Sequence, residues 1–179
     1  MKNAREHMSH YGIDGRTSVP ILAVLTALCA VVLFATVTRA TPPAGVVSNV
    51  MLAQGATVMP LAEMVSVGGS WNVHLEDKGG SEFYFQDLVV GPQGRTGWHT
   101  HPGLLLITVK EGVVDWYDKD CTKHTYGSGQ SFTEGAEPHN VLNPGSGNAH
   151  LLIAYIVKKG EPRRGESEQP KCAGALGIQ

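Results

Sequence analysis

The chain has 179 residues, including 22 glycines and 10 prolines, a composition that favours many turns over long helices. Its formal net charge is −2, and the part from Thr41 onward is mildly acidic. Nucleic-acid-binding proteins usually present a basic face, so the composition argues against nucleic acid as a partner.

The first predicted element is a hydrophobic segment over residues 19–38. Its core, VPILAVLTALCAVVLFATV, is apolar apart from two threonines, and it is about long enough to cross a bilayer as a helix. Basic residues precede it, and their charge is expected to keep residues 1–18 in the cytoplasm. The segment is interpreted as a signal peptide cleaved near Ala40 or an uncleaved membrane anchor. A buried helix of a soluble domain is the less favoured alternative, because the run is long and shows no polar face. We therefore expect an exported protein, secreted or anchored to the outer face of the cytoplasmic membrane.

The part that follows alternates short β-type runs with Gly-rich turns. Many short strands without amphipathic helices predict an all-β sandwich or barrel over residues 41–158. The candidate strands cover residues 46–53, 71–75, 83–90, 97–101, 104–110, 113–117, 130–133, 139–142 and 149–157.

Two cysteines, Cys121 and Cys172, lie in the part of the chain that is expected to be exported. An even number of cysteines in an oxidising compartment indicates a disulfide, and two free thiols are the alternative. Residues 159–179 are polar and rich in Pro and Gly. We expect them to form an extended surface tail, tied to the barrel by the disulfide.

A pair of histidines, His99 and His101, is separated by one residue within a predicted strand. Residues i and i+2 of a strand lie on one face, so both imidazoles are expected to face one ion. His139, at the start of a later predicted strand, is the candidate third ligand. Imidazole suits Fe, Mn, Zn, Ni and Cu, so we expect one divalent transition metal ion. A harmless His-x-His pair on a surface strand is the alternative.

The residues around these histidines resemble the two conserved motifs of the cupin family, over roughly residues 91–157. The matching residues are Gly94, His99, His101 and Gly112 in the first motif and Gly127, Gly135, His139 and Asn143 in the second. This resemblance implies a cupin-type double-stranded β-helix, or jelly-roll barrel, with the three histidines as metal ligands. Small cupins often pair through strand exchange or sheet edges, so the resemblance also implies a possible homodimer.

The match to the family is incomplete at its glutamate ligand, because Leu105 occupies that position. The second motif has Thr133 in place of proline and one extra residue before the histidine. Without the glutamate, a three-histidine set resembles that of cupin-type thiol dioxygenases in its ligands alone. Glu134 and Gln130 are candidate substitute ligands, although turn and surface roles explain both residues equally well.

Two functions fit this pattern, and no catalytic residue is assigned. The first is a small-molecule enzyme of the oxygenase type, since the inward positions of residues 104–109 are apolar and offer no general base. The second is a non-catalytic module that binds a small ligand or a metal. A metal-free barrel with unused histidines is the third possibility, because one fold hosts many functions.

Overall fold

The computed structural model describes residues 40–178, so the predicted hydrophobic segment over residues 19–38 and the preceding residues 1–18 lie outside it. Within the described part, no helix is long and apolar enough to cross a membrane. The elements are β1 (Ala44–Ala56), β2 (Ala62–Val67), β3 (Trp71–Glu76), β4 (Ser81–Arg95), β5 (His99–Thr100), β6 (Gly103–Glu111), β7 (Val113–Tyr117), β8 (Lys123–Gly127), β9 (Ser131–Glu134), β10 (Asn140–Leu142), β11 (Ala149–Lys158), β12 (Gly165–Glu166) and α2 (Lys171–Leu176).

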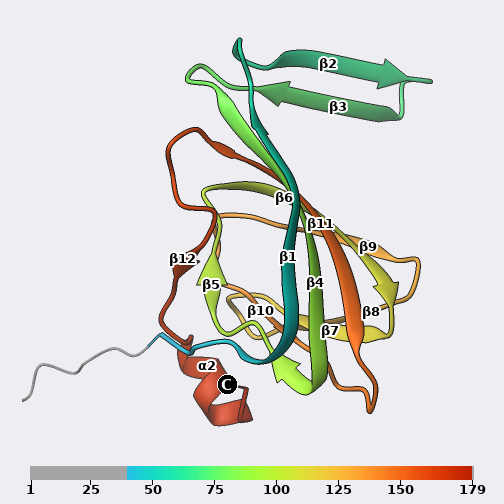
Figure 1. Ribbon diagram of the computed structural model, residues 1–179, viewed down its shortest axis with the longest axis vertical. Helices are drawn as coiled ribbons and strands as arrows, with labels where there is room; N and C mark the ends of the chain where they lie inside the picture. The colour runs from blue at the N-terminus through green and yellow to red at the C-terminus, as the bar shows by residue number, and fades with distance from the viewer. Residues whose placement is uncertain (1–39, 179) are drawn as a thin grey trace, which may run out of the picture. The chain divides into compact units, whose positions relative to one another are not determined.

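Eight of these strands form one antiparallel sheet that curls into a barrel (Figure 1). The strand order is β8-β7-β10-β4-β11-β6-β9, and β1 pairs with β4 as an additional strand. β11 lies between β4 and β6 and pairs with both along most of its length. This arrangement confirms the predicted all-β barrel. The sequence missed β2 and β8, whose residues are largely exposed and lack a clear alternation of apolar and polar side chains.

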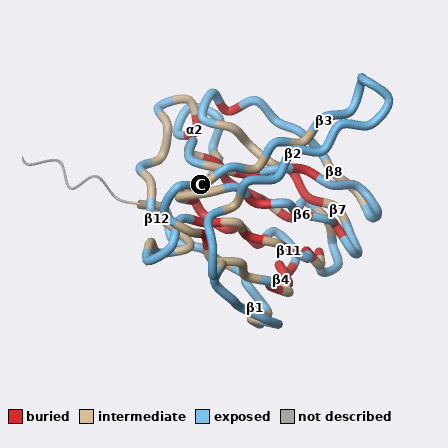
Figure 2. Tube along the Cα trace, turned by 90° about the horizontal axis from the view of Figure 1, so that it is seen from above, coloured by how far each residue is buried: buried red, intermediate tan, exposed pale blue. Residues whose placement is uncertain are grey.

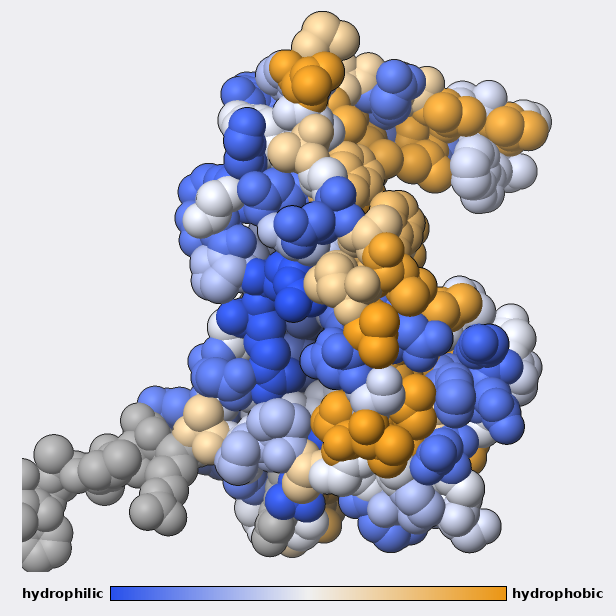
Figure 3. All heavy atoms as spheres, in the orientation of Figure 1, coloured by the Kyte–Doolittle hydropathy of each residue, from blue (hydrophilic) through white to orange (hydrophobic). Residues whose placement is uncertain are grey.

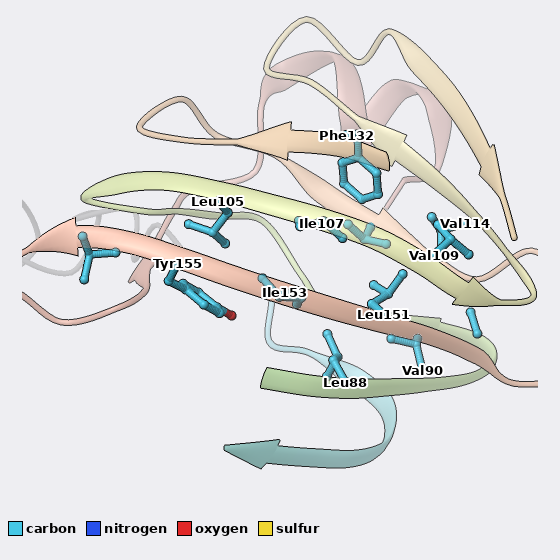
Figure 4. Close-up of a cluster of buried hydrophobic side chains, with 13 residues drawn as sticks. Leu88, Val90, Leu105, Ile107, Val109, Val114, Phe132, Leu151, Ile153 and Tyr155 are labelled. Carbon is cyan, nitrogen blue, oxygen red and sulfur yellow. The ribbon is translucent and has the colours of Figure 1, made fainter. Parts of the chain in front are cut away.

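Strict alternation along β6 and β11 builds the core of the barrel. Leu105, Ile107 and Val109 of β6 and every second residue of β11 from Ala149 are buried, while the residues between them are more exposed. Successive side chains of a strand point to opposite faces, so both strands present one apolar face inward. Figure 4 shows these side chains converging from β4, β6 and β11. The main members are Leu88, Val90, Leu105, Ile107, Val109, Val114, Phe132, Leu151, Ile153 and Tyr155.

Gly103 lies where β6 runs closest to the backbone of β11. A Cβ atom at this position would lie 2.1 Å from the carbonyl oxygen of Ile156. We expect Gly103→Ala to lower the free energy of unfolding by about 1–3 kcal/mol, because the two strands would have to separate. Gly55→Ala in β1 is the matched control, since its Cβ would meet nothing within 4 Å. Urea unfolding measures both, and an equal loss in the two variants would contradict this packing.

The chain after β11 differs from the predicted extended surface tail. Residues 159–178, here called the C-terminal strap, include β12, which pairs with β5, and the helix α2. The predicted disulfide is present, with Cys121 and Cys172 joined across a Cα–Cα distance of 6.1 Å. Trp98 is fully buried and packs in a cluster with Cys121 and Ala173 of α2. The strap is therefore tied to the barrel through β12 and through the disulfide.

The outer surface carries an exposed apolar strip. Figure 3 shows hydrophobic residues gathered along β1 and over the β2–β3 hairpin, and Figure 2 shows that this hairpin is exposed. Val50 and Leu52 of β1 and Trp71 of β3 are among its exposed members. Exposed apolar patches are typical of protein interaction sites. The homodimer implied by the family resemblance remains a prediction.

Candidate metal centre

The structure brings the three predicted histidines together in one buried cluster. The backbones of His99 and His139 exchange two hydrogen bonds, each 3.0 Å from nitrogen to oxygen. This antiparallel bridge places their rings side by side, with centroids 4.4 Å apart. The ring of His101, two residues after His99, has its centroid 4.8 Å from that of His99. The spacing of two residues thus explains why His99 and His101 lie together. The bridge between distant segments of the chain adds the ring of His139.

A carboxylate joins the histidines from a strand that the family motif does not predict. Glu134 ends β9 and pairs directly with Leu105 of β6, the position where the family has its glutamate. Residues opposite each other in an antiparallel pair share one face of the sheet, so Glu134 points into the barrel beside Leu105. Its Oε2 lies 3.4 Å from Nε2 of His101 and 3.3 Å from Nε2 of His139.

Glu134, a candidate substitute ligand in the sequence, thus lies with the three histidines in one buried group. One ligand atom from each of His99, His101, Glu134 and His139 lies within 4.8 Å of the others. The alternation on β9 could have indicated this, since buried Phe132 and Glu134 flank exposed Thr133. Knowing which residue of β6 faces Glu134 requires the strand register.

Gln130, the other candidate substitute ligand, is not part of the group. It lies in the turn before β9, and its side-chain oxygen accepts a hydrogen bond of 2.7 Å from the backbone nitrogen of Gly127. Gln130 therefore stabilises the turn, which is one of the two roles expected for it from the sequence.

Backbone carbonyls fix the orientation of all three imidazoles. The Nδ1 atoms lie within hydrogen-bond distance of a carbonyl oxygen, at 2.7 Å for His99, 2.6 Å for His101 and 2.7 Å for His139. A carbonyl oxygen only accepts, so each Nδ1 carries a proton, and Nε2 is the ring nitrogen that remains available as a ligand atom. Such outer contacts typically orient metal-binding histidines. The acceptor for His101 is the carbonyl of Arg163, so the C-terminal strap directly positions one of the rings.

The buried polar atoms of this group fit a metal ion. Nε2 of His101, Nε2 of His139 and Oε1 of Glu134 are buried and have no hydrogen-bond partner among the described residues. Leaving such atoms unpaired costs about 1–3 kcal/mol each. A cation would satisfy all of them at once, because nitrogen lone pairs and a carboxylate converge on the same space.

The charge states of the side chains agree with this reading. Burial lowers the pKa of His99 to about 3, so its ring is neutral, as a metal ligand must be. Burial opposes ionisation of Glu134, but the adjacent His139 and His101 outweigh it and hold the pKa of Glu134 below its ordinary value. The centre therefore offers imidazole nitrogen and carboxylate oxygen together, a donor set that suits Zn, Fe, Mn and Ni.

A cavity of about 330 Å³ adjoins the centre, at the lower end of the size range of small-molecule sites. His99, His101 and Glu134 form part of its wall. Its apolar part includes Leu88, Ile107, Val141, Leu151 and Ile153, and its polar part includes Asn49, Gln86, Tyr155, Arg163 and Arg164. Three of the four candidate ligands thus face a space that can admit a small molecule.

Comparison with known proteins identifies a family for part of the chain. Residues 87–155 match the model of the family described as the cupin domain. No curated protein matches the chain. The fold is a cupin-type double-stranded β-helix, and this chain is a small cupin-domain protein.

Solved structures resemble the chain in fold alone. A double-stranded β-helix protein from Klebsiella pneumoniae is 15% identical, with a TM-score of 0.42 over 64% of this chain and 89% of that one. A cupin-like protein from Thermotoga maritima is 16% identical, with a TM-score of 0.42 over 49% of this chain and 65% of that one. A sugar phosphate isomerase of the cupin superfamily from Silicibacter pomeroyi is 19% identical, with a TM-score of 0.38 over 41% of this chain and 50% of that one. The chain spans about half the length of the first structures that it matches.

Proposed function

We propose that this cupin-domain protein holds one divalent transition metal ion on His99, His101, Glu134 and His139 and acts as an oxygenase-type enzyme on a small molecule. The observation that carries the proposal is the convergence of four buried ligand atoms beside a cavity. A bound ion would supply Lewis-acid or redox chemistry at that point. The alternative, a non-catalytic binding module, is an outcome of the test below.

The residues of the cavity favour redox chemistry over acid–base catalysis. Among the described residues that line it, Glu134 is the only acidic one, and it faces the histidines. Burial raises the pKa of Tyr155 to about 12, so its phenol keeps its proton at neutral pH. The chain's own contribution is then to orient three imidazoles through backbone carbonyls, to surround the substrate with apolar side chains and to exclude water.

Export is part of the proposal. The Cys121–Cys172 disulfide supports it, because disulfides persist mainly in oxidising compartments. The hydrophobic sequence over residues 19–38 supports it as well, as a signal peptide or as an anchor to the outer face of the membrane. Cell fractionation with and without protease treatment of intact cells would distinguish a released protein, an anchored protein and an unexported one.

The metal and the activity can be tested together. The full chain, produced in a strain that exports it, would be purified and its metal content measured by elemental analysis. We expect about one transition metal ion per chain, since the group offers ligands for one ion. Iron with oxygen uptake on a thiol or a dihydroxy-aromatic compound would support the enzyme. Zinc, nickel or copper without turnover would support the binding module, and a chain that takes up no metal would contradict both.

The role of Glu134 has its own test. We expect Glu134→Gln to weaken metal affinity by at least about tenfold, because the substitution keeps the shape but removes the negative charge. Glu111→Gln on β6 is the matched control, since Glu111 is exposed at the end of the strand. Competition with a chelator measures both affinities. Equal metal affinities in the two variants would show that Glu134 is not a ligand and would favour a set of three histidines.

A further inference from the structure

The C-terminal strap places two arginines at the cavity, and they differ in how their charge is balanced. Arg164 forms a paired contact with Glu166, at 2.6 Å from Nε to Oε1 and 3.0 Å from Nη2 to Oε2. Arg163 also lines the cavity but has no acidic partner among the described residues. One guanidinium charge beside the candidate metal centre is therefore left without a carboxylate.

Contacts with neutral groups hold this guanidinium in place. Nη1 of Arg163 donates a hydrogen bond of 3.1 Å to Oε1 of Gln86, which also accepts from the hydroxyl of Tyr155. The amide nitrogen of Gln86 donates to Oδ1 of Asn49 at 2.7 Å, which fixes the amide orientation. The guanidinium carbon lies 5.2 Å from the ring centre of Tyr84 and 5.5 Å from that of Tyr155. Cation–π contacts at this range favour a fixed position over a freely moving side chain.

The unmatched part of Arg163 is suited to a carboxylate. Guanidinium has five N–H donors in a planar fork, and only one donor of Arg163 has an acceptor among the described residues. The fork matches a carboxylate in two parallel hydrogen bonds. A divalent ion neutralised by a single Glu134 carboxylate would add further positive charge, which also favours an anion.

The apolar lining of the cavity indicates the rest of the ligand. Leu88, Ile107 and Leu151 present apolar side chains to the same cavity. Building on the proposed metal site, we propose that the cavity binds a small carboxylate with an apolar body. Its carboxylate pairs with Arg163, and its body packs against the apolar wall beside the metal ligands. Arg163 is then the residue that selects an acid over the corresponding neutral amide.

The test compares 4-fluorobenzoate with 4-fluorobenzamide, which share their size and apolar ring but differ in charge. Binding of each to the full chain in mild detergent is followed by fluorine NMR, with the protein loaded with Zn²⁺ and again without metal. We expect the benzoate to bind the unmodified chain at least about tenfold more tightly than the benzamide, the usual scale for a charge-assisted pair. Inorganic phosphate serves as a competitor. If phosphate displaces the benzamide as readily as the benzoate, the site does not recognise the carboxylate and the proposal is contradicted.

The variants separate Arg163 from the metal. Arg163→Gln is expected to abolish the preference for the benzoate, whereas Arg163→Lys retains part of it. Arg164→Gln is the matched control on the same strap, and we expect it to keep the preference because Glu166 already balances that charge. A preference that survives in Arg163→Gln, or that appears only with Zn²⁺, would assign the carboxylate to the metal and overturn the proposal.

The metal content of every sample is measured in parallel. The carbonyl of Arg163, which positions His101, is part of the backbone, so Arg163→Gln should keep its metal. A chain that binds no metal but prefers the benzoate would refute the proposed function and leave the carboxylate site standing. A chain that binds metal but shows no preference for the benzoate would refute the carboxylate site and leave the proposed metal site standing.

Discussion

Replacing His101 with alanine is expected to remove most of the bound metal. Nε2 of His101 is a buried candidate ligand atom, 3.4 Å from Oε2 of Glu134, in the group of four residues that could hold an ion. Loss of one of four ligands should lower the metal content to below about a tenth of that of the unmodified chain after dialysis. Elemental analysis of the dialysed protein measures the effect.

His150→Ala is the matched control for this experiment. His150 lies on β11, outside the group of four ligands, and is only half-buried. We expect this variant to keep its metal. Circular dichroism of both variants would check that the barrel is folded. If both variants are folded and contain the same amount of metal, the proposed ligand set is contradicted. If both lose their metal together with the circular dichroism signal of the barrel, the loss reflects unfolding.

Removal of the disulfide should have the second large effect, because the disulfide anchors the strap that orients His101. The bond joins residues 51 positions apart, and a cross-link of this length typically adds about 2–4 kcal/mol to the free energy of unfolding. We expect the Cys121→Ser/Cys172→Ser double variant to lose about that much in urea unfolding. Release of the strap should also remove the carbonyl of Arg163 from Nδ1 of His101, which typically lowers metal affinity by about 10–100-fold.

The control uses a reducing agent. A reductant should destabilise the unmodified chain to the level of the double variant and should leave the double variant unchanged. An unmodified chain whose unfolding midpoint does not respond to the reductant would argue that the bond contributes nothing. A double variant that loses stability but keeps full metal affinity would contradict the link between the strap and His101, while leaving the metal site intact.

Local patterns in the sequence predicted the barrel and most of its strands. The alternation along residues 104–110 and 149–157 appears in β6 and β11 with nearly the same limits. The i and i+2 spacing of His99 and His101 was sufficient to expect both rings on one face. These predictions succeeded because the period of a pleated strand is two residues and requires no knowledge of the neighbouring strands.

The all-β class, the histidine pair and the even number of cysteines could be predicted from the sequence, because all three depend on local spacing or composition. The position of Glu134 beside Leu105, where the family motif has its carboxylate, came from the tertiary structure, because it depends on how β9 aligns with β6. The tertiary structure alone also decided that the strap runs beside β5 and brings Arg163 to the cavity. Such contacts join segments far apart in the chain. The strand register and the course of the strap that create them leave no periodic pattern in the local sequence.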